Sequence, residues 1–559
     1  MAAFFNIGEK KTRPGVYFRY ENYGTPPAAG ADDGVCAVTV RSNWGPVGEA
    51  VLLEGYEAVA KTYGSGGANG TTDAALQEFY GGAQQVYAVR LGSGGTNGGY
   101  SITAPADPSA EGWYTAGTNS YVPSADTARE DGKVYYTVSA TKVTPGSGDA
   151  PATEGWYELD GSTGTYTKST DTEAGEKDYY ELEAAAATAL TADVITMAMK
   201  HPGSRQFSVT IRPTLADPSV TELLFLEGTE QLERLEFSNA GNSVDALMEA
   251  FGEAGGAYFT LTKIKDNPNA LTSVAQAPIT PGTDPSVTNA SYSAAFEALE
   301  PYRWNVLALD TEDASVQGMM QLFLNRIYQD GRCCMGVAGC PTTAAFATRL
   351  VNAAAFNDYQ VVYVGNGFVG TDGIVYEGYR AAARVAGMIA GTPGNESVTH
   401  AAVSGAASLS EALSNAQIIQ ALKSGMLVFS ASAAGAVWVE QGINTLVSPG
   451  QNDDEGWKKI KRVKVRFELF QRLNDSAEAL VGRVNNDPDG RATVIQVSNG
   501  VCNAMIAEKK LLAGARVEED ADNPPQGDSA WFTVYADDAD SMEKLYFTFK
   551  FRFAPESAD

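Results

Sequence analysis

The chain has 559 residues and a formal net charge of -28, from 68 acidic and 40 basic residues. This length exceeds what one hydrophobic core normally serves, so we expect several domains. A hydrophobic content of 44%, with 10% aromatic residues, is typical of a folded protein and excludes a disordered one. The strong acidity disfavours stable nucleic-acid binding, which needs a positive field.

Cysteine usage and hydropathy exclude two further classes of protein. The five cysteines, an odd number at irregular spacing, do not describe a disulfide framework. Residues 1–11 lack the apolar core of a signal peptide, and no run of about 18 apolar residues is present to span a membrane. We therefore expect a soluble protein made in the cytoplasm, without stable membrane binding.

The amino-terminal part predicts an extended arm followed by the first strands of a folded domain. Residues 1–30 contain one short strand, at 13–20, and a glycine-rich linker. Residues 35–40 and 86–91 have the composition of strands, with a helix expected between them at 56–63.

An internal repeat follows, with a period of about 44 residues. The sequence Glu-Gly-Trp-Tyr at 111–114 returns at 154–157, and Tyr-Tyr pairs return in the same order. Aromatic pairs separated by Gly, Ser, Thr and Asp are typical of small β-modules with tight turns. We interpret residues 105–184 as an inserted tandem pair of β-rich modules. The insertion serves either as passive surface or, through exposed aromatic side chains, as a carbohydrate-binding surface.

The middle of the chain alternates strands with helices. Strands are expected at 304–309, 333–337 and 360–364, and helices at 315–328 and 342–353. This alternation predicts a wholly or partly parallel sheet.

A glycine-rich segment after the last of these strands matches a nucleotide-binding pattern only formally. Residues 365–370 fit the spacing Gly-x-Gly-x-x-Gly, which in a dinucleotide-binding fold opens a helix. Residues 371–376 instead contain Asp-Gly, a typical hairpin dipeptide, and then a strand-like run. We therefore predict a β-hairpin here and no nucleotide site.

The residues able to support other chemistry form no recognisable set. Cys333, Cys334 and Cys340 have no Cys-x-x-Cys spacing and no histidine neighbour, so buried structural thiols are expected. His201 and His400 have no accompanying nucleophile motif. We expect no enzyme, no catalytic residue, no cofactor and no metal. The alternatives left open are an α/β enzyme and a glycan-binding surface protein.

A compact basic stretch opens the carboxy-terminal region, with six Lys or Arg residues within positions 458–466. We read it as a basic strand, followed by an amphipathic helix from 467 to 481 and a second helix at about 493–512. The six positions are Lys458, Lys459, Lys461, Arg462, Lys464 and Arg466.

The chain ends in a segment with the alternation of a half-buried strand, at 545–553. Such an aromatic strand leaves an aggregation-prone edge unless another strand covers it. The amino-terminal arm is a candidate donor for that edge, by strand addition. The residues of this expected exchange between subunits are Val16, Tyr17, Phe18, Phe547, Phe549, Phe551 and Phe553.

Several segments together resemble the contractile tail sheath proteins of bacteriophages and phage tail-like particles. The resemblance is strongest in the run Ala-Gly-Met-Ile-Ala-Gly-Thr-Pro at 386–393 and covers nearly the whole chain except 105–184. The other matching segments are 13–17, 45–48, 200–205, 397–399, 442–446, the basic stretch, 482–486 and 542–546.

The resemblance implies a multidomain α/β and α+β fold. The expected domains are a central α/β sheath domain, the inserted β-modules, and a carboxy-terminal α+β assembly domain completed by strands from neighbouring subunits. Their expected bounds are 1–30 for the arm, 31–104 with 185–435 for the outer and middle sheath domains, 105–184 for the insertion, and 436–559 for the assembly domain.

The function implied is structural. Sheath subunits stack as hexameric rings around a tail tube, and contraction drives the tube through the target cell envelope. The implied partners are further copies of the chain, the tail tube protein, and baseplate and tail terminator proteins, in a particle assembled in the bacterial cytoplasm. The basic stretch then becomes the expected tube-facing surface.

Overall fold

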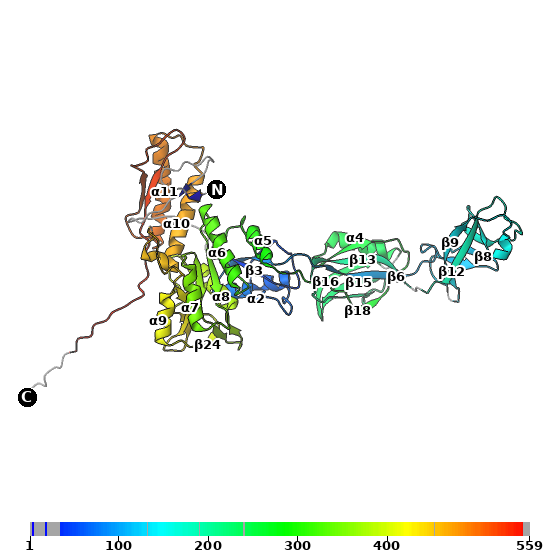
Figure 1. Cartoon of the computed structure of the whole chain (residues 1–559), viewed down its shortest axis with the longest axis horizontal. Coiled ribbons are helices and arrows are strands. Elements are labelled where there is room, and N and C mark those ends of the chain that lie inside the picture. Colours follow the sequence, from blue (N-terminus) through cyan, green and yellow to red (C-terminus); the bar gives the residue numbers. More distant parts are fainter. Residues whose placement is uncertain are drawn as a thin grey trace, which may run out of the picture. The chain divides into compact units, whose positions relative to one another are not determined.

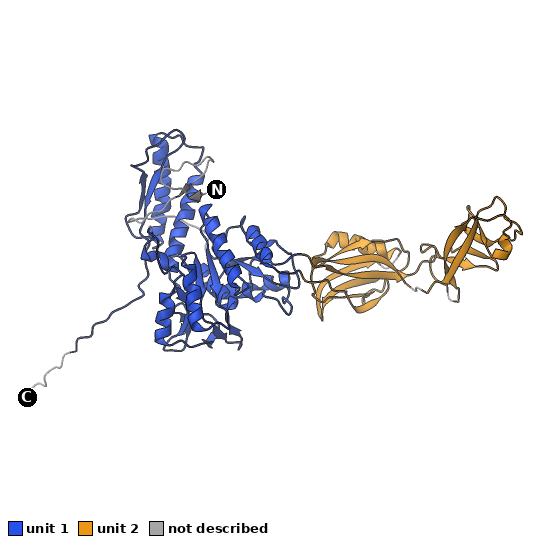
Figure 2. Ribbon diagram, in the orientation of Figure 1, with its two compact units in different colours: residues 1–93, 286–559 blue, residues 94–285 orange. Residues whose placement is uncertain are grey.

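The computed structural model describes residues 34–551 except 131, 189–190, 239–240 and 452, together with the backbone of 3–4 and 17–18. The chain forms two compact units, coloured separately in Figure 2. The first unit contains residues 1–93 and 286–559, and the second contains residues 94–285.

The first unit is built on a seven-stranded sheet of order β25-β21-β20-β19-β3-β5-β4. Neighbouring strands are parallel except for β4 and β5. The predicted, largely parallel sheet is therefore confirmed. Its strands are β3 (Val35–Val40), β4 (Ala50–Leu53), β5 (Gln85–Arg90), β19 (Val306–Ala308), β20 (Met335–Gly339), β21 (Val361–Val364) and β25 (Met426–Leu427).

Helices cover both faces of this sheet (Figure 1), which is why its strands are apolar runs. One face carries α1 (Tyr56–Tyr63), α2 (Asp73–Gly81) and α8 (Tyr379–Gly391). The other carries α5 (Asn289–Leu299), α6 (Ala314–Gln329), α7 (Phe346–Phe356) and α9 (Asn415–Lys423).

Close packing of α2 on α8 explains the glycines of the run at 386–393. A Cβ atom on Gly387 would lie 2.0 Å from the carbonyl oxygen of Glu78, and one on Gly391 would lie 2.3 Å from that of Gly82. Only glycine permits this approach of two backbones. The most distinctive segment of the sequence is thus a packing motif.

The glycine-rich segment after β21 forms the predicted hairpin. Strands β22 (Phe368–Gly370) and β23 (Val375–Tyr376) pair antiparallel, and β24 (Ala406–Leu409) extends the small sheet. A second small antiparallel pair is β26 (Phe429–Ala431) with β27 (Val437–Val439).

The second unit contains two antiparallel sheets, β17-β13-β6 and β16-β15-β14-β18. The rings of Phe225 and Phe259, one from each sheet, lie 5.0 Å apart in their common core. Within the region expected as outer and middle sheath domains, residues 191–278 thus form antiparallel strands with the helix α4. The elements are β6 (Asn97–Pro105), β13 (Thr191–Pro202), β14 (Ser208–Pro213), β15 (Val220–Glu227), β16 (Glu230–Ser238), α4 (Ser243–Ala254), β17 (Phe259–Lys263) and β18 (Val274–Pro278).

The two repeats form one closed barrel, of order β10-β11-β8-β7-β9-β12. Strands of different repeats pair with each other, β8 with β11 and β9 with β12. The two repeats of the expected tandem pair therefore close one barrel together, because three short strands cannot close a barrel alone. The elements are β7 (Tyr114–Ala116), β8 (Ser120–Pro123), β9 (Tyr135–Val143), α3 (Pro151–Glu154), β10 (Tyr157–Asp160), β11 (Thr165–Lys168) and β12 (Tyr179–Ala186).

The carboxy-terminal part of the first unit packs two long helices together around Val465, Leu469 and Met505. Its elements are the short 3-10 helix η1 (Glu455–Lys458), α10 (Ile460–Glu478), α11 (Pro488–Ala507), β28 (Arg516–Glu519) and β29 (Phe532–Tyr535). Helix α10 begins inside the basic stretch, so the predicted basic strand is wrong. Ile460, Val463 and Phe467 are buried at helical spacing on the core of the sheet.

The predicted final strand has no ladder partner within the described part of the chain. Residues 541–551 form neither a helix nor a strand, and residues 544–551 are all exposed. A β-ladder needs two strands, and no other segment of the described chain pairs with this one. Val16 and Phe553 lie outside the described residues. Within the arm, β1 (Ala3–Phe4) pairs parallel with β2 (Tyr17–Phe18).

Candidate assembly interface

The six cations of the basic stretch all contact groups of their own chain. Lys458 pairs with Glu455, one turn away in η1, at 2.8 Å. Lys464 donates from Nζ to the carbonyl oxygens of Ile389 and Thr392, at 2.7 and 2.6 Å. A cation at these carbonyls caps the carboxyl end of α8 and opposes its dipole. Lys464 is therefore a structural residue.

Arg462 and Arg466 hold a buried carboxylate that the sequence reading did not single out. Asp538 is 7% exposed, and its carboxylate accepts hydrogen bonds from Nε and Nη2 of Arg462, the latter at 2.8 Å. Arg466 donates to the same carboxylate at 3.1 Å and to Asp454 at 2.9 Å. Burial alone would raise the pKa of Asp538, but the hydrogen bond and charges of the two guanidinium groups outweigh it and lower the pKa.

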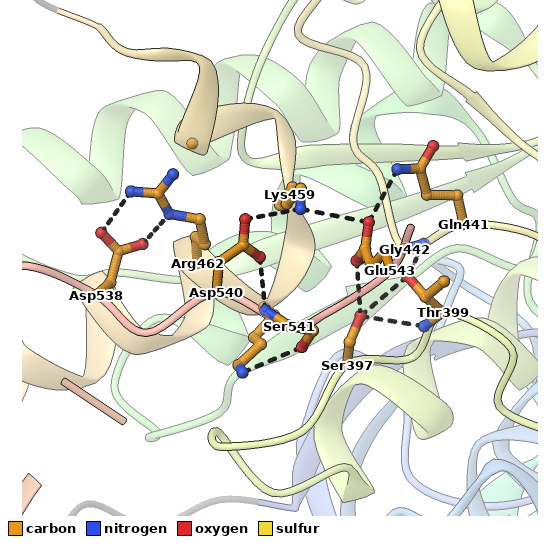
Figure 3. Close-up of polar contacts among 12 residues, drawn as sticks. Ser397, Thr399, Gln441, Gly442, Lys459, Arg462, Asp538, Asp540, Ser541 and Glu543 are labelled. Carbon is orange, nitrogen blue, oxygen red and sulfur yellow. Dashed lines mark hydrogen bonds and ion pairs between the residues drawn. The ribbon is translucent and has the colours of Figure 1, made fainter. Parts of the chain in front are cut away.

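Lys459 and Lys461 bind residues that follow Asp538 in the chain. Figure 3 shows Lys459 with Asp540 and Glu543. The Nζ atom of Lys459 lies 2.7 Å from a carboxylate oxygen of Asp540 and 3.3 Å from one of Glu543. Lys461 donates to the hydroxyl of Ser541 at 3.1 Å.

Glu543 is also held from the side opposite α10. Its carboxylate accepts the hydroxyl of Thr399 and the amide of Gln441, both at 3.0 Å. Gln441 stands just before Gly442, whose backbone N–H donates to Thr399 at 2.9 Å. Glu543 thus joins the start of α10 to two loops of the first unit, as Figure 3 shows.

Backbone hydrogen bonds fix the beginning of the same segment. The N–H of Leu512 donates to the carbonyl of Asp537, and the N–H of Ala539 donates to that of Lys510, both at 2.9 Å. Residues 537–543 therefore form a continuous acidic strap over α10. Four of the six cations predicted to face a tube bind this strap: Lys459, Lys461, Arg462 and Arg466.

Beyond the strap the chain becomes apolar and loses its contacts. Leu545, Tyr546, Phe547, Phe549 and Phe551 are 62–94% exposed. We call residues 544–551 the carboxy-terminal arm. The structure thus brings together two sites predicted separately, the basic stretch and the aromatic segment. The acidic residues at 537, 538 and 540 were the available sequence signal for their connection.

The other candidate residues have structural surroundings. Burial raises the pKa of the Cys334 thiol to about 11, so it stays protonated. Asp310, at the carboxyl edge of the sheet, is fully buried and accepts the side chains of Thr39, Thr71, Tyr292 and Arg41. Its lone pairs are therefore engaged within the fold. No group of three potential metal ligands occurs among the described residues.

Both tryptophans of the aromatic repeat are buried. Trp113 and Trp156 are 7% and 6% exposed, and each packs on a buried tyrosine of its own repeat. Helices of the described residues include none with the length and apolarity needed to cross a bilayer.

Comparisons with known proteins agree with the resemblance. Residues 286–445 match the family model for the phage tail sheath protein central domain. The chain is also 28% identical over 225 residues to the uncharacterized protein YqbK of Bacillus subtilis (strain 168). That match covers 40% of this chain and 46% of YqbK, so the chain spans less than half of this curated relative.

Two solved structures share the fold over almost the whole chain. The sheath tail protein from Desulfitobacterium hafniense has a TM-score of 0.61 and 20% identity, and the match covers 95% of this chain and 99% of that one. The sheath tail protein Lin1278 from Listeria innocua has a TM-score of 0.56 and 15% identity, with coverages of 92% and 96%. The predicted resemblance to phage tail sheath proteins is thereby confirmed, by the match of residues 286–445 to the sheath central domain and by the shared fold.

Proposed function

We propose that this chain is the sheath subunit of a contractile phage tail or tail-like particle. The match of residues 286–445 to the sheath central domain carries this proposal. In it, subunits stack as hexameric rings around a tail tube, and contraction of the stack drives the tube through a target envelope. Baseplate and terminator proteins bind the two ends, and assembly takes place in the host cytoplasm.

The exposed arm supports the linkage between subunits. Five large apolar side chains on an extended segment expose surface that a second copy would bury. Strand addition satisfies the backbone and the apolar side chains together. We propose that Phe547, Phe549, Phe551 and Phe553 of the carboxy-terminal arm add to the sheet of one neighbouring subunit. We propose that Val16, Tyr17 and Phe18 of the amino-terminal arm add to the sheet of another.

The tube contact remains a second, weaker part of the proposal. The side chains of Lys458, Lys459 and Arg462 are 28%, 24% and 23% exposed, so their charges are partly open to a partner. Lys458 is the sharpest probe, because it pairs with Glu455 and not with the strap. Lys458→Glu should weaken binding to the tube protein in pull-downs. Unchanged binding would contradict the proposed tube contact.

Negative-stain electron microscopy of the purified protein tests the function directly. The expected result is hollow striated tubes or rings. Uniform small particles at all concentrations would contradict a sheath.

Deletion of residues 1–22 tests the amino-terminal link separately. The variant should stay folded, judged by its thermal unfolding, and should form no tubes. Tubes of normal length from this variant would show that the amino-terminal arm does not link subunits.

A further inference from the structure

The strap and the arm are consecutive parts of one extended segment with opposite surroundings. Between 537 and 543 the backbone or side chains contact α10, the 510–512 loop and the 397–399 turn. From 544 to 551 every residue is exposed. The change occurs within one residue of Glu543. The contacts that hold the chain against the subunit therefore end at Glu543.

The strap is held by charge and hydrogen bonds and not by apolar burial. Asp538 and Glu543 have side chains 4% and 9% exposed and face cations, hydroxyls and an amide. Its apolar side chain Met542 is 81% exposed. Charge-assisted hydrogen bonds in such half-buried sites are stronger than exposed ion pairs. The strap is therefore anchored, and its bonds are independent of the hydrophobic core.

We propose that Lys459, Lys461, Arg462 and Arg466 form an ionic anchor for the chain's own acidic strap, and that this anchor fixes the point and face at which the carboxy-terminal arm leaves the subunit. The basic surface predicted to bind a tube therefore already binds the strap of its own chain. The role of the arm in assembly rests on the proposed function, whereas the anchor itself does not.

The anchor sets the exit of the arm through the last residue that it holds. Glu543 lies 3.3 Å from Lys459 and accepts hydrogen bonds from Thr399 and Gln441, both at 3.0 Å. Leu545, Phe547, Phe549 and Phe551 follow within eight residues and are exposed. The position at which Glu543 is held therefore sets where the rings of the arm leave the subunit.

The anchor also limits the reach of the arm. Seven residues form the strap, and a fully extended residue spans up to about 3.5 Å, so release would lengthen the tether by roughly 25 Å. A neighbour bound to the arm is therefore held close while the anchor is closed. If the anchor opens, the neighbour can move away without leaving the strand that binds it.

Hydrogen–deuterium exchange on the full-length chain at monomeric concentration tests the anchor. In the wild type, amides of the strap, above all Ala539, should exchange at least about tenfold more slowly than those of 545–551. Lys459→Glu with Arg462→Glu should remove that difference. Lys458→Glu is the control, with one charge reversed at the residue next to Lys459, and should leave strap exchange within about twofold of wild type.

A second variant guards against loss of the fold. Asp540→Asn with Glu543→Gln leaves α10 intact and should also speed strap exchange, with protection of α10 and α11 unchanged. A strap that exchanges as fast as the arm in the wild type would overturn the anchor, as would equal release by Lys458→Glu. A protected strap in a protein that forms no tubes would leave the anchor standing and contradict the proposed function.

Discussion

The strap at 537–543 and the arm at 544–551 show how neighbouring pieces of one chain can depend on different partners. Both are extended, yet the strap is acidic and finds its cations on α10, whereas the arm is aromatic and lies exposed. Charges can be matched inside a single subunit. A row of exposed rings on a potential strand is covered only by another strand, so the arm is where we propose that a second copy binds.

Removing the rings of the arm should have the largest effect. Phe547→Ser, Phe549→Ser and Phe551→Ser together should abolish sedimentable assemblies, because the apolar surface that a neighbour would bury is lost. The thermal unfolding midpoint of the monomer should stay within about 2 °C of wild type, since these side chains are exposed. A drop well beyond that would mean that the rings pack within the subunit.

Neutralising the buried carboxylate of the strap should have the next largest effect. Asp538→Asn weakens the charge-assisted bonds to Arg462 and Arg466, which should cost about 2 kcal/mol of local stability. Asp540→Asn is the comparison, because its side chain is 40% exposed, and should cost about 0.5 kcal/mol. Exchange of the strap amides measures both, and equal costs would contradict the difference in burial.

Acid should release the strap, and the mobility of the arm that follows it should then rise. The pKa of Asp538 is lowered in the folded chain, so its contribution is fully present above the unfolded value of about 3.9. That contribution is lost as the pH falls through the lower folded pKa. Fluorescence anisotropy of a dye at position 548 should stay flat from neutral pH to about pH 4 and fall below it. A fall that begins near neutral pH would point to a different titrating group.

Salt should produce the smallest effect. Raising ionic strength to about 0.5 M screens the half-exposed contact of Lys459 with Asp540 more than the buried contact of Arg462 with Asp538. Strap exchange should therefore quicken by only about twofold to threefold, with the residues near Asp540 responding first. Complete release of the strap at this salt concentration would show that the buried contact of Arg462 with Asp538 contributes little to holding it.

The elements of the parallel sheet were predictable because their signals are local. The apolar runs at 35–40 and 361–364 are buried on both faces, and each lies within one residue of its predicted bounds. The hairpin at 368–376 followed from Asp372-Gly373, where Gly373 adopts φ 80°. These residues determine their own conformation.

The start of α10 and the closure of the barrel were not predictable in the same way. Val463 faces the core of the sheet and Val465 faces α11, so a helix buried on two sides shows a strand-like alternation. The barrel closes through pairs such as Tyr121 with Tyr166, which lie in different repeats. The strap was missed for a related reason, because Asp538 meets Arg462 only after the chain has passed through α11 and both final strands.

Electron microscopy of the wild type beside a variant that ends at residue 543 tests the central claim most directly. The account predicts striated tubes or rings for the wild type and single folded subunits for the variant, with the strap still protected from exchange in both. Small uniform particles for the wild type, or tubes formed equally well without the arm, would contradict it.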